Sequence, residues 1–241
     1  MSRTSTTVAA VAAIFAIALT ACGGGGGSAA PPQATTYDLQ KGISSLVSQG
    51  QTGNLALSGT ALVNGNPVPF TGTGTLTLAP SVAATFNNTA ALSQTQTIAA
   101  TITAAGQTTS LGATSVVDYY DSGNDAFLAE TSHVTYDVAQ SPFTYPTMVV
   151  GGSTGTLGTI SNYTDSTMSV SVGTTEVTYA VTAPVDPGGP VLVKVTNLSK
   201  DPMGNVTETD VTSYTLTGGG ILTLTSESLQ NRDSSLLATV Q

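Results

Sequence analysis

Apolar and polar residues alternate along residues 55–78 and predict a first β-hairpin. The alternation passes through Asn64-Gly65, a dipeptide typical of two-residue type I′ hairpin turns. Such a turn places Gly59 opposite Phe70, so that the Phe70 ring can cover the gap left by the missing side chain. In this register eight apolar residues of the hairpin share one face (Leu55, Leu57, Ala61, Val63, Val68, Phe70, Leu76 and Leu78). One apolar face is what a half-buried antiparallel sheet requires.

Further short segments with strand-like alternation follow, separated by turns rich in Gly, Asn, Asp and Pro. They lie at residues 81–86, 94–103, 107–111, 116–120, 126–138, 147–150, 157–163, 168–172, 176–182, 191–198, 206–216 and 221–225. Residues 140–146 and 183–190 interrupt the series, and residues 227–241 show no clear pattern. We therefore expect an all-β antiparallel meander of about ten strands, arranged as a curved sheet, an incomplete barrel or a sandwich.

One N-terminal helix is predicted at residues 36–50, directly before the hairpin. Its apolar residues recur three and four positions apart and form one stripe that we expect to pack on the sheet (Leu39, Ile43, Leu46 and Val47). Thr35 or Thr36 can cap the N-terminus, which places Asp38 in the first turn beside the positive end of the helix dipole. Gly50 is the expected C-terminal stop.

The segment before this helix has the pattern of a secretory signal. Residues 8–19 are apolar throughout, but a helix of that length spans only about 18 Å, whereas a membrane crossing needs about 20 residues. The apolar run ends in Leu19-Thr20-Ala21-Cys22, which resembles the lipobox of bacterial lipoproteins. The resemblance implies that residues 1–21 are a signal peptide and that lipidated Cys22 holds the chain at a membrane.

The expected domain organisation follows from this N-terminus. Cys22 is the only cysteine, so no disulfide can form within the chain, and lipidation removes the free thiol. Residues 22–35 are rich in Gly and Pro and predict a flexible tether, and residues 36–241 predict a single β-rich domain. The resemblance further implies the outer membrane, because Gly23 stands where inner-membrane lipoproteins commonly carry Asp.

Charge and composition narrow the class of partner. The formal net charge is −9, which disfavours nucleic acid and anionic lipid surfaces. Only 8% of the residues are charged, so Thr, Ser, Gly and Asn supply the polar surface. Aromatic residues make up 5% of the chain and Trp is absent, which disfavours a membrane barrel with aromatic girdles. The regular alternation disfavours a disordered, mucin-like stalk.

Residues able to carry chemistry are sparse. His133 is the only histidine, and alternation places it on a polar strand face, so no metal site with several His ligands can form within the chain. Asp118, Asp121, Asn124 and Asp125 form a weak Ca²⁺ candidate, because Ca²⁺ takes several oxygen ligands. The same residues are typical of an ordinary turn. No cofactor and no catalytic residue are predicted.

These observations favour a non-catalytic structural or interaction module of the cell envelope, whose partners are the membrane and an envelope protein. Segments 145–152, 155–158 and 163–167 resemble stretches of uncharacterised proteobacterial lipoproteins, and this resemblance implies no activity. The order of helix and meander is similar to that of the periplasmic carriers of lipoprotein sorting. It favours, as the alternative, a carrier of an apolar ligand such as a lipid, and an enzyme is the least expected function.

The three functions predict different interiors. A carrier requires an unfilled sheet interior with an apolar cavity of several hundred Å³. A structural module predicts neither a cavity nor a cluster of buried carboxylates. An enzyme requires at least two ionisable groups that converge in a cleft and have shifted pKa values.

Overall fold

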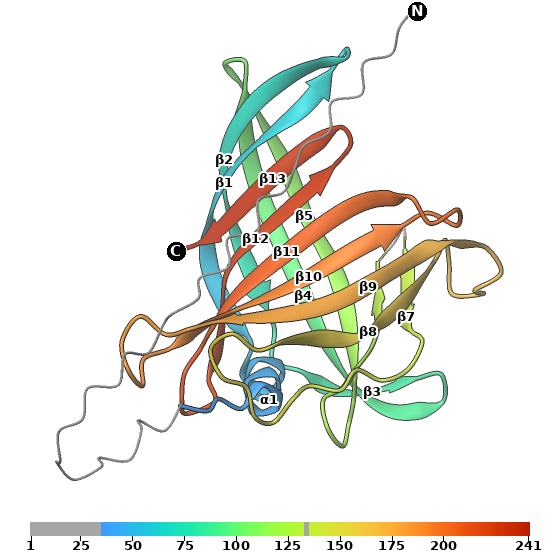
Figure 1. Ribbon diagram of the computed structural model, residues 1–241. Coiled ribbons are helices and arrows are strands. Elements are labelled where there is room, and N and C mark those ends of the chain that lie inside the picture. Colours follow the sequence, from blue (N-terminus) through green and yellow to red (C-terminus); the bar gives the residue numbers. More distant parts are fainter. Residues whose placement is uncertain (1–34, 133–134) are drawn as a thin grey trace, which may run out of the picture. The chain divides into compact units, whose positions relative to one another are not determined.

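The structure, a computed structural model, describes residues 35–132 and 135–241 (Figure 1). Cys22 and His133 lie outside the described residues. Within the described ranges the chain has one helix, α1 (Leu39–Gln49), and thirteen strands. The strands are β1 (Gln51–Val63), β2 (Asn66–Leu78), β3 (Val82–Phe86), β4 (Thr89–Ala104), β5 (Gln107–Asp121), β6 (Phe127–Thr131), β7 (Tyr136–Ala139), β8 (Thr154–Tyr163), β9 (Ser171–Thr182), β10 (Val191–Lys200), β11 (Val206–Leu216), β12 (Leu222–Asn231) and β13 (Ser234–Val240). No helix in these ranges is both long and apolar enough to cross a membrane.

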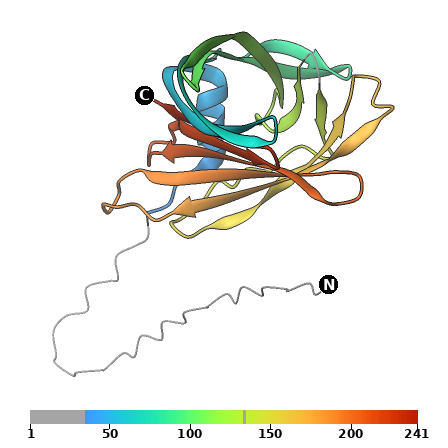
Figure 2. The ribbon, with the colours of Figure 1, turned by 90° about the horizontal axis from the view of Figure 1, so that it is seen from above.

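The described strands belong to one antiparallel sheet that closes on itself. Neighbouring strands follow chain order from β3 to β13, and β13 then pairs with β1. Strand β2 completes the ring, because it pairs with β1 along one edge and with the second half of β4 along the other. Twelve of the described strands thus form a closed barrel, and β3 extends the sheet beside the first half of β4. Figure 2 views the ring of strands from above.

The predicted fold class is confirmed, since the described chain is all-β with one N-terminal helix. The sheet closes into a complete barrel, so the sandwich alternative is wrong. Residues 234–240, where the pattern was unclear, form β13, and the strand predicted at 126–138 is divided into β6 and β7. The prediction of a strand at 147–150 is wrong, because within this segment Val149 forms only a single bridge with Tyr37.

The first hairpin has the predicted register. Val63 pairs with Asn66, and Gly59 pairs with Phe70. The turn between the strands has positive φ at both of its residues, 53° and 78°, as a type I′ turn requires. A Cβ on Gly59 would lie 2.6 Å from Cζ of Phe70, which confirms that the ring occupies the space beside this glycine.

Helix α1 begins later than the sequence predicts. Tyr37 is held in extended backbone by two hydrogen bonds of 2.8 Å with Val149. The helix therefore starts after Tyr37, and Asp38 is its N-cap, with Oδ1 accepting a 2.9 Å hydrogen bond from the backbone N–H three residues later. The prediction that Thr35 or Thr36 caps the helix, with Asp38 in the first turn, is wrong. The physical reason is that the bridge with Val149 holds Tyr37 in extended backbone, so the helix cannot begin before Asp38.

The helix covers one end of the barrel (Figure 1). Leu39 and Leu46 of its predicted apolar stripe belong to the main core cluster, and half-buried Ile43 packs against that cluster. Val47 is buried as well. Helix and barrel approach closely at Gly42, where a Cβ would lie 2.9 Å from Cδ1 of Leu216. Gly50 caps the C-terminus, which confirms the predicted stop.

One buried side chain of β4 holds the C-terminal turn of the helix. Gln94 is 2% exposed, and its Nε2 donates to the carbonyl oxygens of Leu46, Val47 and Ala79 at 3.1, 3.2 and 2.9 Å. The last carbonyls of a helix have no partner within the helix. Here Gln94 adds to the backbone N–H groups of Gly50 and Ser81, which donate to the carbonyl oxygens of Leu46 and Val47 at 2.9 Å. Gln94 thereby links the C-terminal turn of α1 to strand β4.

Candidate ligand-binding cavity

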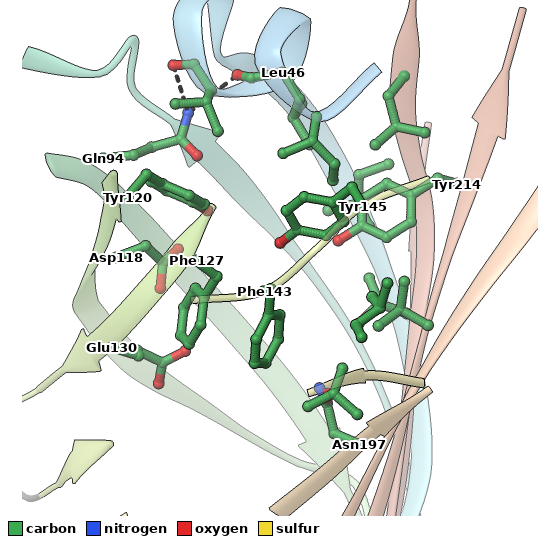
Figure 3. Close-up of a pocket in the computed structure, with 18 of the residues that line it drawn as sticks. Leu46, Gln94, Asp118, Tyr120, Phe127, Glu130, Phe143, Tyr145, Asn197 and Tyr214 are labelled. Atoms are coloured by element: carbon green, nitrogen blue, oxygen red, sulfur yellow. Dashed lines mark hydrogen bonds between the residues drawn. The ribbon is translucent and has the colours of Figure 1, made fainter. Parts of the chain in front are cut away.

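A cavity of about 240 Å³ lies inside the barrel next to α1 (Figure 3). Its lining comes from helix α1, from nine strands and from the segment after β7. Residues far apart in sequence therefore meet in this cavity. A large part of the lining is aliphatic (Leu39, Ile43, Leu46, Val47, Leu78, Leu157, Ile160, Val177, Val193, Val195, Leu222 and Leu224). The cavity therefore offers an apolar surface of the kind that small-molecule sites commonly have.

A row of four aromatic rings forms one side of the cavity. The ring centroids of Tyr120, Phe127, Phe143 and Tyr145 are successively 6.1, 5.1 and 6.4 Å apart, and these residues are called the aromatic row. The first two are cross-strand partners on β5 and β6, and the other two come from the segment after β7. Tyr214 of β11 also lines the cavity, so five of the twelve Phe and Tyr residues in the described ranges face it.

Four carboxylates face the same cavity and are called the acidic wall: Asp118 on β5, Glu130 on β6, Asp210 on β11 and Glu227 on β12. Asp118 and Glu130 are direct cross-strand partners. Because alternate strand residues point to the same side, Asp118 shares the inner face of β5 with Tyr120, as Figure 3 shows. Among the described residues that line the cavity there is no Lys, Arg or His. The interior is thus acidic without a cation supplied by its own lining.

Burial raises the pKa of both glutamates of the acidic wall to about 7. For Glu130, burial is the main cause, and the charges of Asp137 and Asp210 add to it. For Glu227, burial is again the main cause, and Asp210, Glu130 and Glu208 add to it. A glutamate in water titrates near pH 4.3, so these two hold protons at a pH where an exposed glutamate is fully ionised.

The aspartates of the acidic wall also have raised pKa values. Burial and the charge of Glu130 raise the pKa of Asp118 well above its usual range, and a hydrogen bond with Tyr120 opposes the shift. Burial raises the pKa of Asp210, against a 3.1 Å hydrogen bond that Asn197 Nδ2 donates to Asp210 Oδ2. The other oxygen, Asp210 Oδ1, is buried and has no hydrogen-bond partner among the described residues. Such an unpaired group costs roughly 1–3 kcal/mol of stability.

The four residues of the Ca²⁺ candidate do not come together. Asp118 points into the barrel, whereas Asp121 lies three residues further, on the opposite face of β5. Asp121 Oδ1 accepts hydrogen bonds from the backbone N–H groups of Gly123 and Asn124 at 2.8 and 3.2 Å. Asp125 occupies the same turn with a φ of 53°. Within residues 35–132 and 135–241, no three or more His, Cys, Asp or Glu side chains are grouped so that they could hold a metal ion.

Asp118 is among the candidate residues predicted from the sequence, whereas the other three members of the acidic wall are not. A signal was present for Asp210, which lies an even number of residues from Leu216 on the same strand. Leu216 is fully buried, so alternation places the carboxylate on the buried face. The same alternation on β5 places Asp118 in phase with Tyr120. An acidic residue that alternates in phase with buried apolar residues of a strand is thus a sequence signal for a carboxylate that faces the interior.

Comparisons with known proteins show no family for the chain. No protein-family model matches it, and a search of curated proteins found no match. Among solved structures, it is similar to a protein from Bacteroides fragilis described as "a putative exported protein with YMCC-like fold". The two chains are 10% identical with a TM-score of 0.34, over 80% of this chain and 96% of that chain. A TM-score this low supports no inference about function, which is therefore argued from the cavity.

Proposed function

We propose that this chain is a lipid-anchored envelope protein that binds a small amphipathic molecule inside its barrel. The observation that carries the proposal is the cavity, in which aliphatic side chains and the aromatic row face the acidic wall. A purely structural module has no use for buried carboxylates and an unpaired oxygen, because both lower stability. Costly ionisable groups that converge on a cavity are typical of functional sites. The cavity thus favours the carrier over the structural module.

A larger side chain inside the cavity is expected to prevent ligand binding. Val195 of β10 lines the cavity, and Val195→Phe places a larger side chain in that space. In native mass spectrometry of the Cys22→Ser chain purified from its own host, we expect one small molecule per protein. We expect none when Val195→Phe is added. The fold of each variant is checked by thermal unfolding, because overpacking costs about 1–3 kcal/mol.

The control for this experiment is Val185→Phe, the same substitution at a side chain that is 98% exposed. It is expected to retain the ligand. If the parent protein is recovered without a small molecule and also binds neither added 1-octanol nor added n-octylamine, the proposed function is wrong.

Catalysis is a second candidate, and the pairing of Asp118 with Glu130 favours it. The two carboxyls are cross-strand partners in the cavity, and a pKa of about 7 suits Glu130 to acid–base work near neutral pH. A carrier returns its ligand unchanged, whereas an enzyme converts it. Mass spectrometry of the recovered ligand after incubation with the protein separates the two. A conversion that Glu130→Gln abolishes would establish catalysis.

Membrane attachment is expected to depend on Cys22. The lipobox-like residues Leu19-Thr20-Ala21-Cys22 support lipidation, and the two acyl chains of a diacylglyceryl group suffice for stable anchoring. Cys22→Ser is expected to move the protein from the membrane fraction to the soluble fraction, as followed by immunoblot. Ser28→Ala, a change in the predicted tether, serves as the control and should leave the distribution unchanged. A Cys22→Ser protein that stays with the membranes contradicts the proposed anchor.

A further inference from the structure

We infer that the ligand of this cavity is an organic cation, an alkyl- or arylammonium. Its charged end is held by the acidic wall, and its apolar part lies against the aromatic row and α1. The inference rests on the proposed function and adds the chemical class of the ligand.

The carboxylates inside the barrel lack a compensating positive charge. Four carboxylates share the cavity, and none of the described lining residues is cationic. The ion pair between Lys200 and Glu176, at 3.1 Å, lies on the outer face, because Glu176 alternates with Val177, which points inward. Burying a carboxylate is costly, whereas an opposite charge within about 4–6 Å favours its ionised form. A bound cation therefore stabilises groups that the fold alone leaves unfavourable.

One carboxylate oxygen of the acidic wall lacks a hydrogen-bond donor among the described residues. Asp210 Oδ2 accepts a hydrogen bond from Asn197, but Asp210 Oδ1 is buried without a partner among the described residues. An ammonium group carries up to three N–H donors and no acceptor, so it can serve this oxygen and a neighbouring carboxylate together. An alcohol offers one donor. An ionised fatty acid offers none and adds repulsion.

The aromatic rings of the cavity also favour a cation. The faces of Phe and Tyr rings attract a cation that lies within about 6 Å of the ring centroid, and aromatic cages bind alkylated ammonium groups in this way. The aromatic row and Tyr214 line the same cavity as the acidic wall, as Figure 3 shows for most of these residues. The rings also provide an apolar surface for the remainder of the ligand. Carboxylates and rings together therefore favour a cation with an organic body over an inorganic one.

The volume limits the size of the ligand. A cavity of about 240 Å³ is below the roughly 300–1,000 Å³ of sites for drug-sized molecules. We therefore expect a ligand smaller than a drug-sized molecule, with on the order of ten non-hydrogen atoms. n-Octylammonium has this size and serves as the probe.

Isothermal titration calorimetry at pH 8 with n-octylamine, 1-octanol and octanoate tests the inference. The three probes share a chain length and differ in charge, and an alkylamine stays protonated at this pH because its pKa resembles the value of about 10.4 for Lys. For the Cys22→Ser chain we expect n-octylammonium to bind at least about tenfold more tightly than 1-octanol, since charge-assisted hydrogen bonds are the stronger ones. We expect no binding of octanoate.

Substitutions in the acidic wall identify the charged end of the site. Asp210→Asn keeps the size of the side chain and can still bond with Asn197, but it removes the charge. We expect this variant to bind n-octylammonium about tenfold more weakly and 1-octanol equally well. Glu227→Gln is expected to act in the same direction and replaces Asp210→Asn if that variant does not fold. Glu176→Gln, which removes a carboxylate from the outer face, should change neither affinity.

The outcomes separate this inference from the proposed function. Equal affinity for 1-octanol and n-octylammonium would overturn the inference and leave a binding protein for neutral amphiphiles. Absence of binding for all three probes would overturn both. If n-octylammonium binds but neither Asp210→Asn nor Glu227→Gln weakens it, the cation lies elsewhere and the inference is also overturned.

Discussion

The free energy of unfolding is expected to fall by on the order of 3 kcal/mol between pH 5 and pH 8. Glu130 and Glu227 have pKa values of about 7 in the folded chain, whereas glutamate in an unfolded chain titrates near 4.3. Between these values the folded chain holds protons that the unfolded chain has released. Rising pH therefore favours unfolding, and the slope disappears above the folded pKa, where both states are ionised.

The groups that face these two glutamates act in the same direction or add repulsion. Burial raises the pKa of Asp137 and Asp210 as well. Ionisation of these two aspartates therefore also lowers the free energy of unfolding as the pH rises. Glu208 contributes negative charge next to Glu227. Because these carboxyls repel one another, their effects are not additive, and the expected total is smaller than the sum of independent shifts at about 1.4 kcal/mol per pKa unit.

Urea unfolding of the Cys22→Ser chain at pH 5, 6, 7 and 8 measures this dependence. The double variant Glu130→Gln, Glu227→Gln is expected to show a flatter profile and to exceed the parent in stability at pH 8. Glu176→Gln, on the outer face, is the matched control and should keep the slope of the parent. A parent protein whose stability stays constant or increases between pH 5 and pH 8 contradicts the account of the acidic wall.

Gln94→Glu is expected to destabilise the protein by about 3–5 kcal/mol at neutral pH. The substitution keeps the shape of the side chain but replaces the Nε2 donor by an acceptor. Three carbonyl oxygens that now receive hydrogen bonds, those of Leu46, Val47 and Ala79, would face a buried carboxyl instead. A loss of this size is a large share of the 5–15 kcal/mol by which folded domains are typically stable.

The urea midpoint and the thermal midpoint followed by circular dichroism measure the effect. Gln107→Glu makes the same chemical change at an exposed position on β5 and is expected to alter stability by less than about 0.5 kcal/mol. A Gln94→Glu protein as stable as Gln107→Glu would show that the helix does not depend on this side chain. Loss of stability without loss of n-octylammonium affinity in the remaining folded protein would separate the role of Gln94 from ligand binding.

The parts of the fold that follow from short-range rules could be predicted from the sequence. A two-residue turn fixes the register of β1 and β2, and alternation then assigns the inner face, so the pairing of Gly59 with Phe70 was accessible. The apolar stripe and the C-terminal stop of α1 were accessible for the same reason. The N-cap was not, because the bridge between Tyr37 and Val149 sets the helix start, and that contact joins distant parts of the chain.

The candidate site depends on long-range closure, and most of it lay beyond sequence reasoning. Phe143 and Tyr145 belong to a segment that showed only an interruption of the strand pattern, yet both rings line the cavity. Asp210 and Glu227 face Asp118 across the barrel only because β2 also pairs with β4 and closes the sheet. Alternation indicates which side of a strand a carboxylate occupies. It does not indicate that this side encloses a cavity.

The order of the strands has a consequence for how the chain folds. From β4 to β13 each strand pairs with its neighbour in sequence, so these contacts form locally, but β1 pairs with β13, the last strand of the sheet. Until residues 234–240 are available, β1 and β12 each keep an exposed edge, and the acidic side chains can remain hydrated. Full burial of the four carboxylates therefore requires the last strand of the chain to pair with the first. Their energetic cost falls on the closed barrel and not on the separate hairpins.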